Sequence, residues 1–263
     1  MLTERVRQEI VGNIEAVYKG GEPLIPLTRS YADITLEDSY EIQKSFVENR
    51  LREGADLRGY KVGLTSKAMQ AFAGTDEPDY GALLDYMFIH EGSEIPAERW
   101  FDPLVEIEIA FVLKDRLAGG SVTPVDVIRA TDFLLPAIEL VDFRLQRALG
   151  INCIDTVADL AAVGAVIVGA NPVRLEDIDV RAIEGRLLKN GESVANGSAA
   201  EVLGNPVNAV AWLANKLNAF GVTFEPGHLI LTGSFVRAEP VVAGDDIVAR
   251  FDDPFGDIRI SFV

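Results

Sequence analysis

Residues 103–113 read Pro103-Leu104-Val105-Glu106-Ile107-Glu108-Ile109-Ala110-Phe111-Val112-Leu113. Their β-branched, aromatic and other apolar side chains predict a buried strand. Glu106 and Glu108 are two residues apart, so both point to the same face of that strand, about 7 Å from one another. A second apolar run, Leu134–Val141, carries a third carboxylate, Glu139. The sequence therefore predicts two core strands that bring acidic side chains into an apolar setting.

A carboxylate is costly to bury unless its charge is compensated. Neither apolar run contains Lys or Arg, so we expect Glu106, Glu108 and Glu139 to share a divalent cation. Oxygen-only ligands favour Mg²⁺, Mn²⁺ or Ca²⁺ over zinc. The alternative is a half-solvated antiparallel strand whose glutamates face water. Because Leu134–Val141 is apolar on both faces apart from Glu139, the shared metal is the favoured interpretation.

Composition excludes several classes of function. The 263 residues carry 48% hydrophobic side chains, which suits one large globular unit, and a formal net charge of -17, which disfavours nucleic acid and anionic lipid as partners. Cys153 is the single cysteine, so no internal disulfide is expected and a reducing cytoplasm fits. The N-terminus lacks a signal-like apolar core, and the longest low-polarity run, 160–170, is too short to span a bilayer.

The first part of the chain reads as helical. Thr35 and Asp38 resemble a capping box at the start of one helix. After Gly54 short apolar runs of β character dominate, and only two later helices are well signalled, at Thr123-Pro124 and from Asn205-Pro206 to Gly221. We therefore expect a helical segment over 1–55, packed on a β-rich metal-binding domain over 56–263.

The order of these elements predicts the fold class. Strands and helices do not alternate strictly, which disfavours a doubly wound parallel sheet. Asn190-Gly191 between two short runs is a strong hairpin signal. We therefore expect a mixed α+β fold built round a rolled or sandwiched sheet.

Three further segments offer chemistry. Lys61 lies midway between Gly59 and Gly63, two glycines that would allow close approach of a backbone or a ligand. It could stabilise an oxyanion near the metal, or be a surface lysine on an edge strand. Asp79, which Pro78 and Gly81 bracket in an expected turn, could act as a general base or only as a turn residue.

The third segment is Thr232-Gly233-Ser234, which follows the apolar run Leu229–Leu231. Small residues with free N–H groups at a strand end commonly receive a carboxylate or phosphate. The alternative is an ordinary glycine between a strand and a loop.

Taken together, these residues resemble the hydratase/decarboxylase family of aromatic meta-cleavage pathways, which is related to fumarylacetoacetase. The resemblance covers nearly the whole chain and includes a closing strand at the C-terminus. Its motifs occur in order with matching gaps: Lys61-Val62-Gly63-Leu64-Thr65-Ser66, Pro78-Asp79-Tyr80-Gly81, Val105-Glu106-Ile107-Glu108, Pro136-Ala137-Ile138-Glu139 and Gly233-Ser234.

The resemblance implies a fumarylacetoacetase-like curled mixed β-sheet with flanking helices, and a higher homo-oligomer. It implies a Mg²⁺ (or Mn²⁺) site formed by Glu106, Glu108 and Glu139, with Asp79 and Lys61 beside it as catalytic residues. The implied substrate is a short 2-oxo acid with a conjugated double bond, such as 2-oxohept-4-ene-1,7-dioate, to which water is added. The residues expected to contact it are Thr65, Lys67, Leu84, Gly233 and Ser234.

Two other activities stay open within this resemblance. The same site could release CO₂ from 4-oxalocrotonate, or the chain could be a non-catalytic partner in a hydratase–decarboxylase complex. The segment Lys67-Ala68-Met69-Gln70 resembles the hydratases more than the decarboxylases. Lys67 is also the candidate partner for the distal carboxylate of a diacid, or else a solvated helix residue. Leu160 stands where relatives usually carry Asn, which would alter substrate orientation if that Asn contacts the substrate.

Overall fold

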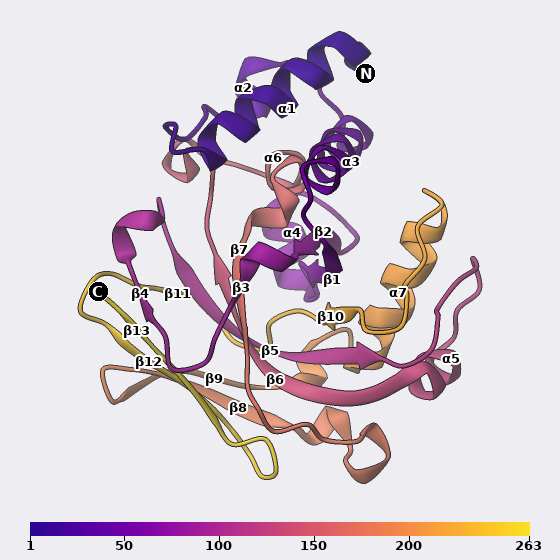
Figure 1. Ribbon diagram of the computed structural model, residues 1–263, viewed down its shortest axis with the longest axis vertical. Coiled ribbons are helices and arrows are strands. Elements are labelled where there is room, and N and C mark those ends of the chain that lie inside the picture. Colours follow the sequence, from indigo (N-terminus) through magenta and orange to yellow (C-terminus); the bar gives the residue numbers. More distant parts are fainter.

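A computed structural model describes the backbone of all 263 residues and every side chain except that of Phe72. The N-terminal segment contains α1 (Glu4–Tyr18), α2 (Leu27–Ser30) and α3 (Leu36–Arg52). Thr35 and Asp38 form the expected capping box at the start of α3. Figure 1 shows α1 and α3 together at the top of the molecule, above the strands. Their apolar faces join the main hydrophobic core through side chains such as Ile14 and Phe46.

The larger sheet contains the strands that carry the predicted acids. Its hydrogen-bonded order is β2-β1-β10-β5-β6-β7-β3, and β11 also pairs with β5. Only the β1–β10 and β3–β7 pairs are parallel, so the sheet is mixed as expected. The strands are β1 (Leu57–Gly63), β2 (Asp79–Leu84), β3 (Phe88–Ile89), β5 (Leu104–Leu113), β6 (Thr131–Val141), β7 (Val163–Val168), β10 (Leu229–Leu231) and β11 (Glu239–Pro240).

A second sheet lies beneath β5 and β6 in Figure 1. Its order is β4-β13-β12-β8-β9, with β4 (Glu94–Ile95), β8 (Glu184–Lys189), β9 (Glu192–Ser198), β12 (Asp246–Phe251) and β13 (Asp257–Phe262). Asn190-Gly191 forms the predicted hairpin turn, and both residues have positive φ. Gly185 of β8 lets the sheets approach, because an added Cβ would lie 2.7 Å from Ile107 of β5. The α+β prediction with a curled sheet is therefore confirmed.

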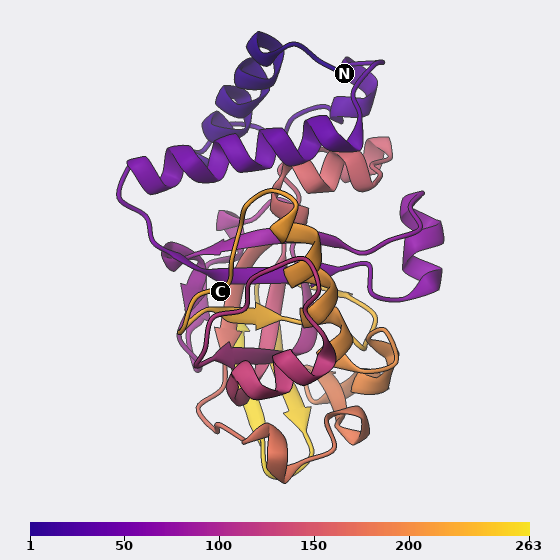
Figure 2. The ribbon, with the colours of Figure 1, turned by 90° about the vertical axis from the view of Figure 1, so that its right-hand side faces the viewer.

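The remaining helices flank the sheets. They are α4 (Lys67–Ala73), α5 (Pro124–Ala130), α6 (Cys153–Ala158) and α7 (Pro206–Asn218), and Figure 2 shows α5 and α7 at the front of the strands. The predicted N-caps Thr123 and Asn205 both accept hydrogen bonds from their helices. Single 3₁₀ turns are η1 (Asp85–Met87), η2 (Ala97–Arg99), η3 (Arg147–Leu149), η4 (Leu160–Ala162), η5 (Leu175–Asp177), η6 (Val180–Ala182) and η7 (Ala199–Glu201). Within the described part of the chain, no helix combines the length and apolarity that a membrane span requires.

One local prediction was wrong. Asp79 is the first residue of β2 and pairs with Gly63, rather than sitting in a turn between Pro78 and Gly81. Tyr80, Ala82, Leu83 and Leu84 are all buried in this strand. The apolar residues that follow Gly81 therefore extend a strand that pairs with β1, and this tertiary pairing overrides the local turn signal.

The turn η4 has an unusual backbone. Leu160, Ala161 and Ala162 all have positive φ, at 52°, 51° and 60°. A left-handed conformation costs roughly 1–2 kcal/mol for each residue with a Cβ. Gly81 makes room for this turn, because an added Cβ would lie only 2.0 Å from the carbonyl oxygen of Leu160.

Gly81→Ala should therefore lower the free energy of unfolding by about 1–3 kcal/mol, the usual cost of overpacking a rigid site. Gly12→Ala is the matched control, because its Cβ would meet nothing within 4 Å in α1 and alanine favours a helix. Urea unfolding measures both variants. An unfolding free energy for Gly81→Ala equal to that of the unmodified chain would contradict this account of the contact with Leu160.

Candidate functional site

The pairing of β5 with β6 brings the three predicted acids together. Glu106 lies directly opposite Glu139 in the register, and Glu108 follows two residues along β5. One oxygen of each carboxylate lies within 4.8 Å of the others. Glu108 and Glu139 are buried, with 1% and 0% exposure, and Glu106 is half-buried. This arrangement offers three oxygen ligands to one cation.

The surroundings leave much of this negative charge unsatisfied. The backbone N–H of Gly233 donates to Glu108 Oε2 over 2.7 Å. Both oxygens of Glu139 are buried and accept no hydrogen bond from the described residues. Lys61 Nζ, at 3.3 Å from Glu139 Oε1, is the neighbouring positive charge. Buried carboxylates without donors are rare and costly, so the donor set fits a hard divalent cation.

Lys61 and Asp79 come from neighbouring positions on β1 and β2. Both side chains are buried, with 6% exposure each. An added Cβ on Gly63 would lie 2.2 Å from Asp79 Oδ1 and 3.1 Å from Lys61 Nζ. A Cβ on Gly59 would lie 1.8 Å from the carbonyl oxygen of Leu229. The expected close approach at both glycines is therefore present, with a backbone at one and a carboxylate at the other.

Burial and mutual repulsion shift the protonation of this cluster. Desolvation, reinforced by Glu139, raises the pKa of Glu106 to about 7. The same two causes raise the pKa of Glu108 well above its usual value. Desolvation raises the pKa of Asp79 to about 6, although Lys61 opposes the shift. Burial alone would lower the pKa of Lys61, but Glu139 and Asp79 raise it, which favours the charged ammonium form of Lys61.

A cavity of about 960 Å³ opens onto this cluster at Lys61, Asp79 and Glu106. Its wall follows β5 outward from Glu106 to Leu104 and continues to Asp102, which lies before the start of the strand. The wall from β6 continues through Val141 to Phe143. Leu104 and Val141 are paired in the register and pack with Ala162 in a small apolar cluster apart from the main core.

Only two of the five residues expected to contact substrate line the cavity. Thr65 and Ser234 line the cavity. Gly233 lies beside it, but its N–H is already donated to Glu108, so that group is not free to bind a substrate. Leu84 is fully buried in the main core and Lys67 is exposed on α4, and neither lines the cavity. Lys67 Nζ instead donates to Gln70 Oε1 over 2.9 Å.

The left-handed turn η4 forms part of the cavity wall. Ala161 and Ala162 line it, whereas the side chain of Leu160 is 1% exposed and packs in the main core. Buried Arg144 holds the turn, because its Nε donates to Asp159 Oδ1 over 2.8 Å and its Nη2 to the carbonyl oxygen of Val163 over 2.8 Å. The side chain of Leu160, where the sequence departs from the family pattern, therefore faces the core and not the cavity.

Sequence reasoning missed two cationic residues of the cavity, Arg147 and Arg237. Arg147 Nε donates to Asp102 Oδ2 over 2.6 Å, and its guanidinium lies 5.1 Å from the ring centre of Phe143. The alternation Glu139, Val141, Phe143 continues beyond the end of β6, and this pattern was the available signal for that wall.

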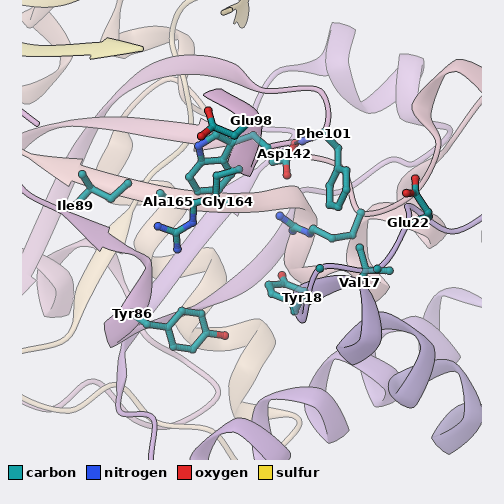
Figure 3. Close-up of a pocket in the computed structure, with 15 residues that line it drawn as sticks. Val17, Tyr18, Glu22, Tyr86, Ile89, Glu98, Phe101, Asp142, Gly164 and Ala165 are labelled. Atoms are coloured by element: carbon teal, nitrogen blue, oxygen red, sulfur yellow. Dashed lines mark hydrogen bonds between the residues drawn. The ribbon is translucent and has the colours of Figure 1, made fainter. Parts of the chain in front are cut away.

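A second cavity, of about 420 Å³, lies between the end of α1 and strand β7. Figure 3 shows Tyr18 and Tyr86 on one side of it and Glu98 on the other. Its described lining includes none of the predicted site residues. The carboxylate cluster and the larger cavity together are therefore the candidate active site.

The chain was compared with known proteins. It is 41% identical over 270 residues to 2-oxo-hept-4-ene-1,7-dioate hydratase of Escherichia coli, covering 100% of both chains. It is 34% identical over 261 residues to 2-keto-4-pentenoate hydratase of Paraburkholderia xenovorans (strain LB400), covering 99% of this chain and 96% of the other.

A solved structure agrees with this relationship. The 4-oxalocrotonate decarboxylase from Pseudomonas putida G7, complexed with magnesium and adipate, superposes with a TM-score of 0.96 and 32% identity over 100% of this chain and 99% of that one. The fumarylacetoacetate (FAA) hydrolase C-terminal profile matches residues 60–263. These matches confirm the resemblance seen in the sequence motifs, and the chain belongs to the fumarylacetoacetate hydrolase C-terminal family.

Proposed function

We propose that this chain is a metal-dependent hydratase that adds water to a 2-oxo-4-enoate through its 2-hydroxy-2,4-dienoate form, with 2-oxohept-4-ene-1,7-dioate as its substrate. The observation that carries this proposal is the cluster of Glu106, Glu108 and Glu139 beside Lys61 and Asp79 at one end of a cavity. The relatives named as hydratases support a hydro-lyase.

Mg²⁺, or Mn²⁺ in its place, is the proposed cofactor. The solved relative contains magnesium, and the oxygen-only donors and the unpartnered oxygens of Glu139 fit such an ion. When bound, the ion supplies Lewis-acid polarisation and a template for the C1 carboxylate and 2-oxygen of the substrate.

Lys61 and Asp79 have different roles in the proton transfers. The Lys61 ammonium donates to the 2-oxygen as enolate charge develops there. Asp79 Oδ1 is buried and has no hydrogen-bond partner among the described residues, so it is available to the substrate. Asp79 shuttles a proton during ketonisation and accepts a proton from the water that attacks the alkene carbon β to the 2-oxo group. Burial raises the pKa of Asp79, which makes its carboxylate a stronger base.

One specific observation favours a second activity. The solved structure with a TM-score of 0.96 is a decarboxylase, and loss of CO₂ from 4-oxalocrotonate passes through the same kind of dienolate. The third possibility, a non-catalytic partner subunit, is disfavoured because a scaffold has no use for a set of costly buried acids.

A homo-oligomer stays a prediction. Tyr86 and Phe101 line the second cavity and are 43% and 42% exposed. A neighbouring subunit, or a related decarboxylase in a mixed complex, would shield this aromatic surface from water.

The direct test measures the loss of dienoate absorbance for a panel of substrates with and without Mg²⁺. Mass spectrometry then gives the mass of each product. We expect Mg²⁺-dependent loss of 2-hydroxyhepta-2,4-diene-1,7-dioate and a product heavier by one water. Release of CO₂ from a 4-oxalocrotonate-type substrate as the main reaction would overturn the hydratase assignment in favour of decarboxylation.

Glu108→Gln should keep the fold and sharply weaken Mg²⁺ binding, because it removes one negative charge from the ligand set. The matched control is Glu184→Gln, which changes an exposed strand glutamate on β8. Calorimetric titration with Mg²⁺ provides the measurement. Unchanged affinity in Glu108→Gln would exclude Glu108 as a ligand, whereas Glu184→Gln should bind as the unmodified chain does.

Asp79→Asn preserves the shape of the side chain and removes its basicity. We expect kcat to fall about 10²–10⁴-fold, the usual contribution of a general acid–base group, while Mg²⁺ affinity changes little. Asp76→Asn, at an exposed position in the preceding segment, is the control and should leave kcat unchanged. Steady-state kinetics that show near-normal kcat for Asp79→Asn would remove Asp79 from the chemistry.

A further inference from the structure

The wall of the larger cavity has a regular chemical order. Its inner end is Glu106, whose register partner is Glu139, and the next pair outward is Leu104 and Val141. Two residues further along each chain segment, outside both strands, come Asp102 and Phe143, which also line the cavity. Each step of two residues advances about 7 Å. A charged inner end is thus followed by an apolar middle and then by a polar outer end.

Arg147 of η3 completes the outer end. Its side chain is 41% exposed, and the hydrogen bond to Asp102 uses only Nε. Among the described side chains, no acceptor is bonded to Nη1 or Nη2. Asp102 and the face of Phe143 fix the plane of the guanidinium, which leaves its outer edge able to take a carboxylate in a bidentate pair.

We propose that Arg147 binds the distal carboxylate of a dicarboxylate substrate and is the specificity-determining residue for diacids over monoacids. This inference rests on the proposed function, which places the C1 carboxylate and 2-oxygen at the inner end. Glu106 and Leu104 lie about 7 Å apart along β5, and Asp102 with its partner Arg147 lies beyond the start of that strand.

A seven-carbon diacid is long enough to pass the apolar pair Leu104 and Val141. Its terminal carbons lie about 7.5 Å apart when extended, given carbon–carbon bonds of about 1.5 Å. With an oxygen–Mg²⁺ contact of about 2.1 Å at one end and a hydrogen bond of about 2.9 Å at the other, the diacid reaches well beyond the step of about 7 Å between Glu106 and Leu104. A five-carbon monoacid stays within the apolar middle and leaves the pair of Arg147 with Asp102 undisturbed.

The other cations near the cavity are less suited to this role. Arg237 also lines the cavity, but its side chain is 79% exposed and lies 3.4 Å from Glu239. Among the described side chains, no aromatic ring packs against the Arg237 guanidinium. Lys67, the candidate from the sequence, lies outside the cavity lining. Arg237 is therefore the natural control for Arg147, because it carries the same charge and lines the same cavity.

The test compares Arg147→Met and Arg237→Met on the seven-carbon diacid and on a five-carbon 2-hydroxydienoate monoacid. Arg147→Met should raise KM for the diacid about 10- to 100-fold, the range expected for losing hydrogen bonds to a charged group, with kcat nearly unchanged. Its KM for the monoacid should stay constant, and Arg147→Lys should recover part of the loss. Equal effects on both substrates, or a larger diacid effect in Arg237→Met, would overturn the role of Arg147.

A binding measurement separates this inference from the proposed function. Adipate, a diacid, and pentanoate, a monoacid, are titrated into the Mg²⁺-loaded chain and into Arg147→Met. Selective loss of adipate affinity in the variant supports Arg147 even if neither dienoate is hydrated, an outcome that would reject only the hydratase. Hydration of both substrates by the unmodified chain, with adipate affinity unchanged in Arg147→Met, would reject only the role of Arg147.

Discussion

The site depends on an imbalance of buried charge. Four carboxyl groups, those of Glu106, Glu108, Glu139 and Asp79, lie close to a single ammonium, that of Lys61. Desolvation and mutual repulsion raise the pKa values of Glu106, Glu108 and Asp79, so the metal-free cluster reduces its charge by holding protons. A divalent cation satisfies the same requirement while leaving the carboxylates ionised. The pairing of β5 with β6 therefore places negative charge at the inner end of the cavity that a bound cation would neutralise.

A buried ion pair supports the turn η4, which forms part of the cavity wall. Arg144 and Asp159 form a buried ion pair that is tied to the backbone on both sides of η4. Removal of either partner alone would leave an uncompensated buried charge, which is strongly destabilising. Such a clamp can hold three residues in the left-handed region, where strain is tolerated only if the surroundings over-determine it. The cavity wall beside Asp79 is thus a fixed surface and not a flexible loop.

The sequence predicted those features that depend on periodicity and caps. Alternation along β5 placed Glu106 and Glu108 on one face, and the apolar run of β6 placed Glu139 within reach. It could not predict which residue of β6 faces Glu106, because register is decided by the assembled sheet. For the same reason β2 was missed, since its pairing with β1 overrides a local turn signal. Arg147 escaped notice because its role depends on a contact with Asp102, 45 residues away.

The left-handed turn also explains the departure at Leu160. Asn, the residue that the family resemblance leads us to expect there, is one of the few residues with a Cβ that readily adopts positive φ. The backbone at position 160 has φ of 52°, so the asparagine suits the local conformation without any contact to substrate. Leu160 adopts the same conformation at a conformational cost and offsets it by burying its side chain in the main core. Because Ala161 and Ala162 line the cavity and the side chain of Leu160 is buried in the main core, the side chain at position 160 stabilises the wall and is not part of its lining.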